Sequence, residues 1–349
     1  MADGICRGLI DSVRGRLEVN LKARVVWTLP LLAACVGVTV AQQPRLLVSV
    51  KSEQKMAIVD PASGTILGKV DETGFTAHEL AVSPDGRFAF APIYGNSGVG
   101  SPGTDGTKMV KIDIAAQKIV GTLDFGHGAR PHCAVFGPKN GLLYVTTELD
   151  KTVSIIDPKA MKILGTVPTG QPQSHMLAVS PDGARGYTAN VGPGTVSVLD
   201  LKARKLVKVI PISSNTQRIA VTRDGRWVFT ADQAKPQLAV IDTKTDKVAK
   251  WIPLDGFGYG GAMTRDGKWF LMPVPKKAEI EVVDLGTMQV AHKIATMADP
   301  EEVIVTPDGK SAWVSSPATG SVAHVDLAAW KMTRQVKTGG NSDGLAWAQ

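Results

Sequence analysis

The feature that most constrains this chain is an apolar residue followed by aspartate, which recurs seven times at nearly constant spacing. The aspartates of this marker are Asp60, Asp113, Asp157, Asp200, Asp242, Asp284 and Asp326, and the last three intervals are 42 residues each. A turn marker with the pattern Pro-Asp-Gly or Arg-Asp-Gly lies between them and repeats with the same period; its aspartates are Asp85, Asp182, Asp224, Asp266 and Asp308. A fixed period of this length predicts an array of identical supersecondary units.

Within each repeat, short apolar runs alternate with turn signals, which is typical of β-strands. In one repeat we expect strands at residues 176–179, 186–189, 195–199 and 206–209, with Pro181-Asp182-Gly183 joining the first two. Proline fixes φ at its turn position and glycine accepts positive φ, so this tripeptide suits a reversal between antiparallel strands. Four short strands per repeat predict a blade of a β-propeller, whereas a helical solenoid would show a 3.6-residue period.

The two ends of the repeat region complement each other. Residues 45–50 have the pattern of a second strand without its inner neighbour, and residues 344–348 have the pattern of an inner strand without the rest of its blade. Together they complete one blade, so the ring closes and leaves no open sheet edge. The sequence therefore predicts an all-β fold over residues 42–349, a seven-bladed β-propeller of four-stranded antiparallel blades.

The first 41 residues have the pattern of a signal peptide. Lys22 and Arg24 precede an apolar stretch from Val25 to Ala41, which ends in small residues suited to cleavage. A transmembrane helix is the alternative, but the stretch is short and contains Pro30. The segment 32–35 resembles a lipobox, which would make Cys35 a lipid anchor and the one route to a membrane. We expect an exported protein, in the periplasm or at the cell surface.

Charge and cysteine content exclude several classes of function. The formal net charge is +7, of which +5 belongs to residues 42–349, and the Lys and Arg residues are scattered along the sequence without a basic run, so no nucleic-acid partner is expected. Cys133 is the one thiol of the repeat region, which excludes an internal disulfide. No Cys-x-x-Cys-His, Gly-x-Ser-x-Gly, Walker or His-Glu-x-x-His motif occurs. We expect a monomer.

Two segments carry a resemblance to a known family. Leu143-Tyr144-Val145-Thr146 and Gly186-Tyr187-Thr188-Ala189-Asn190 match the motif that names the YVTN family of β-propeller repeat proteins. This family is related to propeller lactonases and to the propellers of cytochrome d1 and amine dehydrogenase. Arg130-Pro131-His132, followed by Phe136, also resembles a segment of propeller lactonases. The resemblance implies the fold and leaves the function open.

One repeat position is polar in every blade. It lies seven residues before the turn aspartate, at the start of the inner strand, and its occupants are His78, His132, His175, Gln217, Tyr259, Glu301 and Asp343. In a propeller these positions converge on the central channel, so they form a candidate ligand site. His78, His132 and His175 could hold a divalent metal ion, and the same ring could bind an anion or supply acid and base groups. The alternative is that these side chains only satisfy strand ends and channel water.

Neighbouring features face the same end of the channel. Arg130 and Arg218 lie beside ring positions and could contact an acidic ligand or only solvent. The second blade carries an extra glycine-rich stretch at residues 95–106, between its second and third strands. This insertion is either a lid over the ring or a neutral loop extension.

The sequence favours a binding module for a protein, a peptide or a small ligand on the face that carries the ring. The first alternative is a hydrolase or lyase of lactonase type, using a channel metal or the His, Glu and Asp residues of the ring. The second alternative is a redox-associated, cofactor-binding subunit, in which one of the three histidines ligates non-covalent haem iron. A divalent metal ion is the one cofactor that the ring pattern itself suggests.

Overall fold

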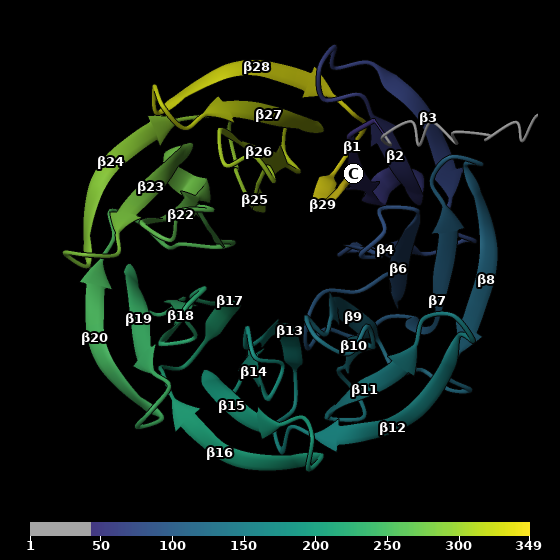
Figure 1. The fold of residues 1–349 in the computed structure, drawn as a ribbon, viewed down its shortest axis with the longest axis horizontal. Coiled ribbons are helices and arrows are strands. Elements are labelled where there is room, and N and C mark those ends of the chain that lie inside the picture. The colour runs from purple at the N-terminus through teal and green to yellow at the C-terminus, as the bar shows by residue number, and fades with distance from the viewer. Residues whose placement is uncertain (1–42) are drawn as a thin grey trace, which may run out of the picture. The chain divides into compact units, whose positions relative to one another are not determined.

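The computed structural model describes residues 43–349, which form a ring of seven β-sheets arranged like the blades of a propeller (Figure 1). The first three blades, from the inner to the outer strand, are β29 (Ser342–Ala348), β1 (Arg45–Val50), β2 (Lys55–Val59), β3 (Ile66–Asp71); β4 (Thr76–Ala77) with β5 (Ala81–Val82), β6 (Phe88–Gly95), β7 (Asp105–Asp113), β8 (Lys118–Asp124); β9 (Pro131–Phe136), β10 (Leu143–Thr147), β11 (Thr152–Asp157), β12 (Lys162–Pro168). Only the second blade has an inner strand in two pieces.

The remaining four blades have the same order, each a meander from the inner to the outer strand. They are β13 (Ser174–Val179), β14 (Arg185–Asn190), β15 (Thr195–Asp200), β16 (Lys205–Pro211); β17 (Thr216–Val221), β18 (Trp227–Asp232), β19 (Gln237–Asp242), β20 (Lys247–Pro253); β21 (Ala262–Met263), β22 (Trp269–Val274), β23 (Glu279–Asp284), β24 (Gln289–Ala295); β25 (Val303–Val305), β26 (Ser311–Ser316), β27 (Ser321–Asp326), β28 (Lys331–Lys337). Two short 3-10 turns, η1 (Lys51–Glu53) and η2 (Pro275–Lys277), interrupt the first and sixth blades. The predicted all-β, seven-bladed fold is confirmed.

The ring closes between the two ends of the described chain. β29 pairs antiparallel with β1, with Leu46 opposite Trp347 and Val48 opposite Leu345. Leu46, Val48 and Leu345 are buried with Trp313 of the seventh blade in one apolar cluster. The predicted closure by the C-terminal strand is therefore confirmed, and it joins the first and seventh blades through a shared core.

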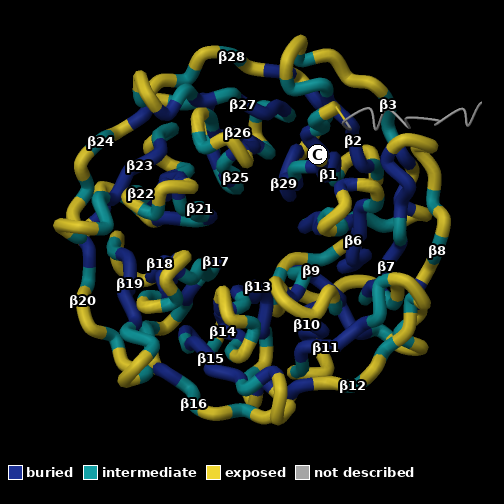
Figure 2. Tube along the Cα trace, in the orientation of Figure 1, coloured by how far each residue is buried: buried dark blue, intermediate teal, exposed yellow. Residues whose placement is uncertain are grey.

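The apolar core lies between neighbouring blades, because each sheet buries both faces against the next one. Figure 2 shows buried residues along the middle strands and exposed residues along the outer strands and turns. The outer strands alternate between exposed and half-buried residues, as in β8 and β12. This alternation matches a sheet with one face on a neighbour and an edge in solvent.

The repeated aspartates have a local structural role, as their turn positions suggest. At the end of β11, Asp157 accepts hydrogen bonds from the backbone N–H groups of Lys159 and Ala160. In the Pro-Asp-Gly turn, the Ser180 hydroxyl donates to Asp182, which also accepts from the N–H of Ala184. Because these bonds satisfy the turn backbone, the aspartates recur in every blade for structural reasons.

The predicted signal peptide and the lipobox-like segment with Cys35 lie outside the described residues. Within residues 43–349, no helix is long and apolar enough to cross a membrane.

Candidate functional site

The ring positions lie at the ends of the inner strands and surround a cavity of about 350 Å³ at the channel mouth. Six of the seven predicted ring residues line it, and Glu301 does not. The cavity-lining residues from the ring are His78, His132, His175, Gln217, Tyr259 and Asp343, joined by Lys51, Glu79, Asn215, Arg218 and the loop residues Gly98 and Val99. The 42-residue period thus places polar side chains from six blades around one small space.

The inner strands are irregular where the ring residues lie. The pairing of β17 with β18 shifts register between Gln217 and Ala220, and Arg218 adopts a left-handed backbone with φ of 57°. Because this bulge breaks the alternation of the strand, both Gln217 and Arg218 face the cavity. A similar shift occurs at His175, between Ser174 and Met176.

Three histidines and a tyrosine form one half of the site. The rings of His132 and His175 lie 3.5 Å apart at an angle of 31°, and Tyr94 contacts both edge-on. Glu148 accepts a hydrogen bond from the Tyr94 hydroxyl at 2.7 Å, and its carboxylate lies 3.2 Å from Nδ1 of His175. Glu148 therefore orients the rings of Tyr94 and His175.

Burial keeps two of these histidines neutral. Burial and the positive charge of Lys51 lower the pKa of His78 to about 3. Burial and the neighbouring His175 lower the pKa of His132 well below its usual range. Burial and the negative charge of Glu148 raise the pKa of the Tyr94 phenol. His78, His132 and Tyr94 are therefore neutral hydrogen-bonding groups at physiological pH.

The three histidines do not form a compact metal-ligand set. Among the described residues, the group that brings three ligand atoms within 4.8 Å of one another is Asp255, Glu279 and Glu281, away from the ring. Ligands of one ion converge on it, and in the described residues the ring nitrogens of His78, His132 and His175 do not form such a set. A metal at His78, His132 and His175 stays a prediction that requires these rings to turn.

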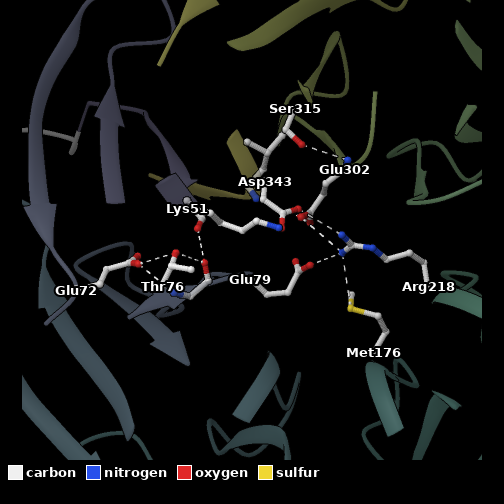
Figure 3. Close-up of polar contacts among 12 residues, drawn as sticks. Lys51, Glu72, Thr76, Glu79, Met176, Arg218, Glu302, Ser315 and Asp343 are labelled. Carbon is white, nitrogen blue, oxygen red and sulfur yellow. Dashed lines mark hydrogen bonds and ion pairs between the residues drawn. The ribbon is translucent and has the colours of Figure 1, made fainter. Parts of the chain in front are cut away.

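A cluster of charges forms the other half of the site. Arg218 forms an ion pair with Glu79 and lies 3.7 Å from both Glu302 and Asp343. Lys51 forms an ion pair with Asp343 at 2.8 Å. Figure 3 shows the carboxyl groups of Glu79, Glu302 and Asp343 around the guanidinium of Arg218, with the ammonium of Lys51 directed at Asp343.

Two carboxyl groups of this cluster have pKa values shifted in opposite directions. Burial and the negative charge of the neighbouring Glu79 raise the pKa of Glu302 well above its usual range. Burial acts in the same direction on Asp343, but Lys51 and Arg218 outweigh it and lower the pKa of Asp343.

Several buried acceptor atoms of the cavity have no hydrogen-bond partner within the described chain. They are Oε1 of Gln217, Oδ1 of Asn215 and Oδ1 of Asp343, and Nδ1 of His132 also lacks a partner. All four residues line the same cavity. Buried polar atoms are almost always paired in native proteins, so this concentration indicates a place for a ligand or for ordered water.

The glycine-rich insertion covers the cavity, as its predicted position between β6 and β7 suggested. Gly98 and Val99 line the cavity directly. Arg130 holds the loop, because its guanidinium donates to the carbonyl of Ser101 at 2.8 Å and pairs with Asp105 at 2.6 Å. Gly100 has a φ of 69°, in the left-handed region that favours glycine, and it lies against the Gln173 side chain.

Two predicted site residues have other positions. Glu301 lies outside the cavity, where burial and the charge of Asp343 raise its pKa to about 7. Arg130 binds the insertion and does not line the cavity. The sequence analysis missed Glu79 and Glu302, although each directly follows a ring position. It also missed Lys51, which comes from η1 and has no counterpart in the repeat pattern.

The acidic group away from the ring already has a cation. The ammonium of Lys293 pairs with Asp255, and Glu281 accepts a hydrogen bond from the backbone N–H of Asp255 at 2.7 Å. Burial raises the pKa of Glu281. This arrangement explains the cluster as a structural contact between β23, β24 and the loop before β21.

Fold and site together define a seven-bladed β-propeller with a polar, loop-covered channel mouth, and comparisons with known proteins agree with this class. The family model for the cytochrome D1 heme domain matches residues 137–266, a stretch that includes His175, Gln217, Arg218 and Tyr259. No curated protein matches the sequence significantly. The YVTN resemblance rests on the sequence motifs alone.

Solved structures share the fold at low sequence identity. Hydrazine synthase from Kuenenia stuttgartiensis aligns with a TM-score of 0.68 and 20% identity, over 80% of this chain and 91% of that chain. The dihydro-heme d1 dehydrogenase NirN in complex with DHE aligns with a TM-score of 0.63 and 15% identity, over 86% of this chain and 74% of that chain.

A functionally unknown protein from Desulfotomaculum acetoxidans aligns with a TM-score of 0.72 and 13% identity, over 87% of this chain and 99% of that chain. Identities this low show a shared fold, and they do not show that this chain binds the ligands of those proteins. The chain is a seven-bladed propeller similar to the cytochrome d1 group, as the sequence predicted.

Proposed function

We propose that the protein binds a small molecule rich in hydrogen-bond donors, such as a polyol or an amine, in the channel-mouth cavity. The part of the glycine-rich insertion that connects β6 and β7, residues 96–104, covers this cavity and is called the 96–104 loop. The observation that carries this proposal is the set of buried oxygen atoms on Asn215, Gln217 and Asp343 that accept no hydrogen bond within the described chain, of which Oδ1 of Asp343 also lies 3.7 Å from Arg218. An unsatisfied buried polar group costs about 1–3 kcal/mol. A ligand that donates to these atoms recovers that free energy, and a ligand without donors does not.

The size and charge of the cavity support the same class of ligand. A volume of about 350 Å³ is at the small end of the range of about 300–1,000 Å³ for ligand sites. The sequence left open an anion bound by protonated histidines. A pKa of about 3 for His78 argues against that mode, because the His78 imidazole stays neutral at physiological pH. The cations Lys51 and Arg218 are already paired.

Haem is the ligand that the similarity to the cytochrome D1 heme domain brings to mind, and the cavity does not fit it. His175 is oriented by Glu148 through Nδ1, an arrangement that suits an axial ligand. However, the ring centroids of His132 and His175 lie only 3.5 Å apart, and Gly98 and Val99 of the loop also line the cavity. A tetrapyrrole is larger than the small ligands that a cavity of about 350 Å³ holds, so haem does not fit this site.

The test is isothermal titration of the full chain with mannitol and with putrescine, each paired with its fully methylated counterpart. We expect the donor-bearing compound of one pair to bind and its methylated form not to bind. Replacement of Gln217 by Leu keeps the side-chain size and removes the acceptor, so it should weaken binding by about tenfold.

Gln289→Leu, on the exposed face of β24, serves as the matched control and should bind like the unchanged protein. The proposal is wrong if neither donor-bearing compound binds, or if the methylated compounds bind equally well. Binding of hemin with a Soret shift, in place of these compounds, would favour the cofactor-binding alternative.

A further inference from the structure

Two neighbouring blades carry the same unusual turn sequence. The fifth blade has Thr222-Arg223-Asp224-Gly225-Arg226-Trp227, and the sixth has Thr264-Arg265-Asp266-Gly267-Lys268-Trp269. In the other turns of this kind, proline occupies the place of Arg223 and Arg265. The spacing of 42 residues puts the two copies at the same turn of adjacent blades, so charges that look scattered along the sequence become neighbours in the ring.

The aspartates of these turns accept hydrogen bonds from their own turns, and the basic residues beside them have no ion-pair partner in the described part of the chain. Asp224 accepts hydrogen bonds from the Thr222 hydroxyl at 2.6 Å and from the N–H of Arg226 at 3.0 Å. Asp266 makes the same two contacts in the sixth blade. The four basic residues are all exposed, and none forms an ion pair with another described residue: Arg223, Arg226, Arg265 and Lys268.

These residues surround one groove of about 690 Å³, whose apolar lining is Met263, Leu285 and the half-buried rings of Trp227 and Trp269. The guanidinium of Arg223 donates to the carbonyl of Arg265 at 2.7 Å and so joins the two turns. We name this surface the basic groove. A second hollow of about 600 Å³ shares Arg265 and Trp269 with it and continues it along the seventh blade.

The continuation carries further aromatic surface. Trp330 lies 5.3 Å from Trp269 in an edge-to-face contact and lines the second hollow together with Lys310. Trp, Met and Arg are the residue types enriched at protein interfaces and among interface hot spots. The basic groove thus has both the apolar centre and the charged rim of a protein-binding surface.

We propose that the basic groove docks an acidic segment of a partner protein, with carboxylates on Arg223, Arg226, Arg265 and Lys268 and an apolar side chain against Met263 and Trp269. Charge complementarity favours this occupant, because the four basic residues have no ion-pair partner among the described residues, whereas the three carboxylates of the groove, Asp224, Asp266 and Asp284, each accept hydrogen bonds within their own turns.

A single-stranded nucleic acid fits the groove less well. Arg226 covers the ring of Trp227, with its guanidinium carbon 4.6 Å from the ring centre, so that ring offers less surface for base stacking.

The groove lies at the turns that end the inner strands, whereas the channel-mouth residues lie where the inner strands begin. The two surfaces are therefore at opposite ends of the strands. Partner docking at the basic groove leaves the channel mouth open to its own ligand, and this inference stands independently of the proposed function.

The experiment measures binding of a fluorescent peptide, Glu-Asp-Glu-Leu-Phe-Glu-Asp-Glu, to the full chain by anisotropy. A peptide with Gln and Asn in place of Glu and Asp is the neutral control. We expect the acidic peptide to bind and the neutral one not to bind, with an affinity that falls as salt is added. The double charge reversal Arg223→Glu/Arg265→Glu should weaken binding by at least about tenfold.

Lys118→Glu/Lys162→Glu changes the net charge by the same amount at exposed positions of β8 and β12, and it should bind like the unchanged protein. Thermal melting shows whether each variant is folded. The inference is overturned by no binding of the acidic peptide, or by an equal loss of binding in both double variants. Preferential binding of an oligothymidylate or of phosphatidylglycerol vesicles at the same residues would also overturn it.

Discussion

At the scale of single residues, Arg218 determines the charge balance of the channel mouth. Its guanidinium pairs with Glu79 and lies close to Glu302 and Asp343, all of them largely shielded from solvent. An unpaired charge in such a place is costly, whereas a paired one is tolerated. Arg218 therefore allows the carboxyl groups of Glu79, Glu302 and Asp343 to lie close together at the channel mouth.

Replacement of Arg218 by Met should lower the free energy of unfolding by about 3–5 kcal/mol, because the buried carboxylate of Glu79 loses its partner. Urea denaturation measures this change. The double variant Glu79→Gln/Arg218→Met should recover part of the loss, since no charge is then left unpaired. Arg265→Met, at an exposed position, should change stability by less than about 0.5 kcal/mol. A double variant as unstable as Arg218→Met would contradict this account.

Glu301 gives a prediction about pH. Burial and the charge of Asp343 raise its pKa to about 7, whereas an unfolded chain has a Glu pKa of about 4.3. The folded protein therefore binds the extra proton between these values, and stability falls as pH rises from about 4.5 to about 7.

Glu301→Gln removes this cost, so the variant should be more stable than the unchanged protein by about 3–4 kcal/mol at about pH 8 and nearly equal to it at about pH 4. Denaturation at both pH values measures the difference. An equal difference at the two pH values would show that the carboxyl does not titrate as described.

The ring positions could be predicted from the sequence, because a fixed repeat makes corresponding residues converge on one axis. The partners of these residues could not be predicted in the same way. A strict alternation along the strand would turn the residue after each ring position away from the cavity, but the bulge at Gln217 and Arg218 turns both toward it. Lys51 comes from a 3-10 turn of the first blade alone, so no periodicity indicates it.

At the scale of elements, the 96–104 loop is the part of the second blade that departs from the repeat. Its place over the ring could be predicted, because a connection between second and third strands lies on the face where inner strands begin. Its attachment could not be predicted, because Arg130, which contacts it, lies in the connection between β8 of the second blade and β9 of the third. The loop therefore depends on one side chain of the third blade.

Arg130→Met removes both contacts and should free the loop. Elastase, which cuts after small aliphatic residues, should then cleave at Val99 several-fold faster than in the unchanged protein, because local opening exposes the bond. Arg87→Met, which removes an exposed ion pair with Asp113 in the same blade, should leave the cleavage rate unchanged. Equal rates in all three proteins would show that Arg130 does not hold the loop.

At the scale of the whole molecule, closure makes the seven blades one structure. An open array of repeats can lose its terminal unit while the others stay folded. In this ring, β29 belongs to the same blade as β1 and packs on the seventh blade through Leu345. The complementary ends of the repeat region made this closure predictable, because each end holds the strands that the other lacks.

Leu345→Ala should therefore destabilise all blades together, although it lies in the last strand. Truncation of a buried leucine costs about 2–5 kcal/mol, and Leu345 is only 3% exposed. Far-UV circular dichroism and tryptophan fluorescence should show the same lower denaturation midpoint, because the closed ring of described residues has no terminal blade that can unfold alone. Leu164→Ala, at a residue of β12 that is 42% exposed, should shift neither. Two separate transitions in the Leu345 variant would mean that the first blade detaches from an otherwise intact array, and closure would then add no cooperativity.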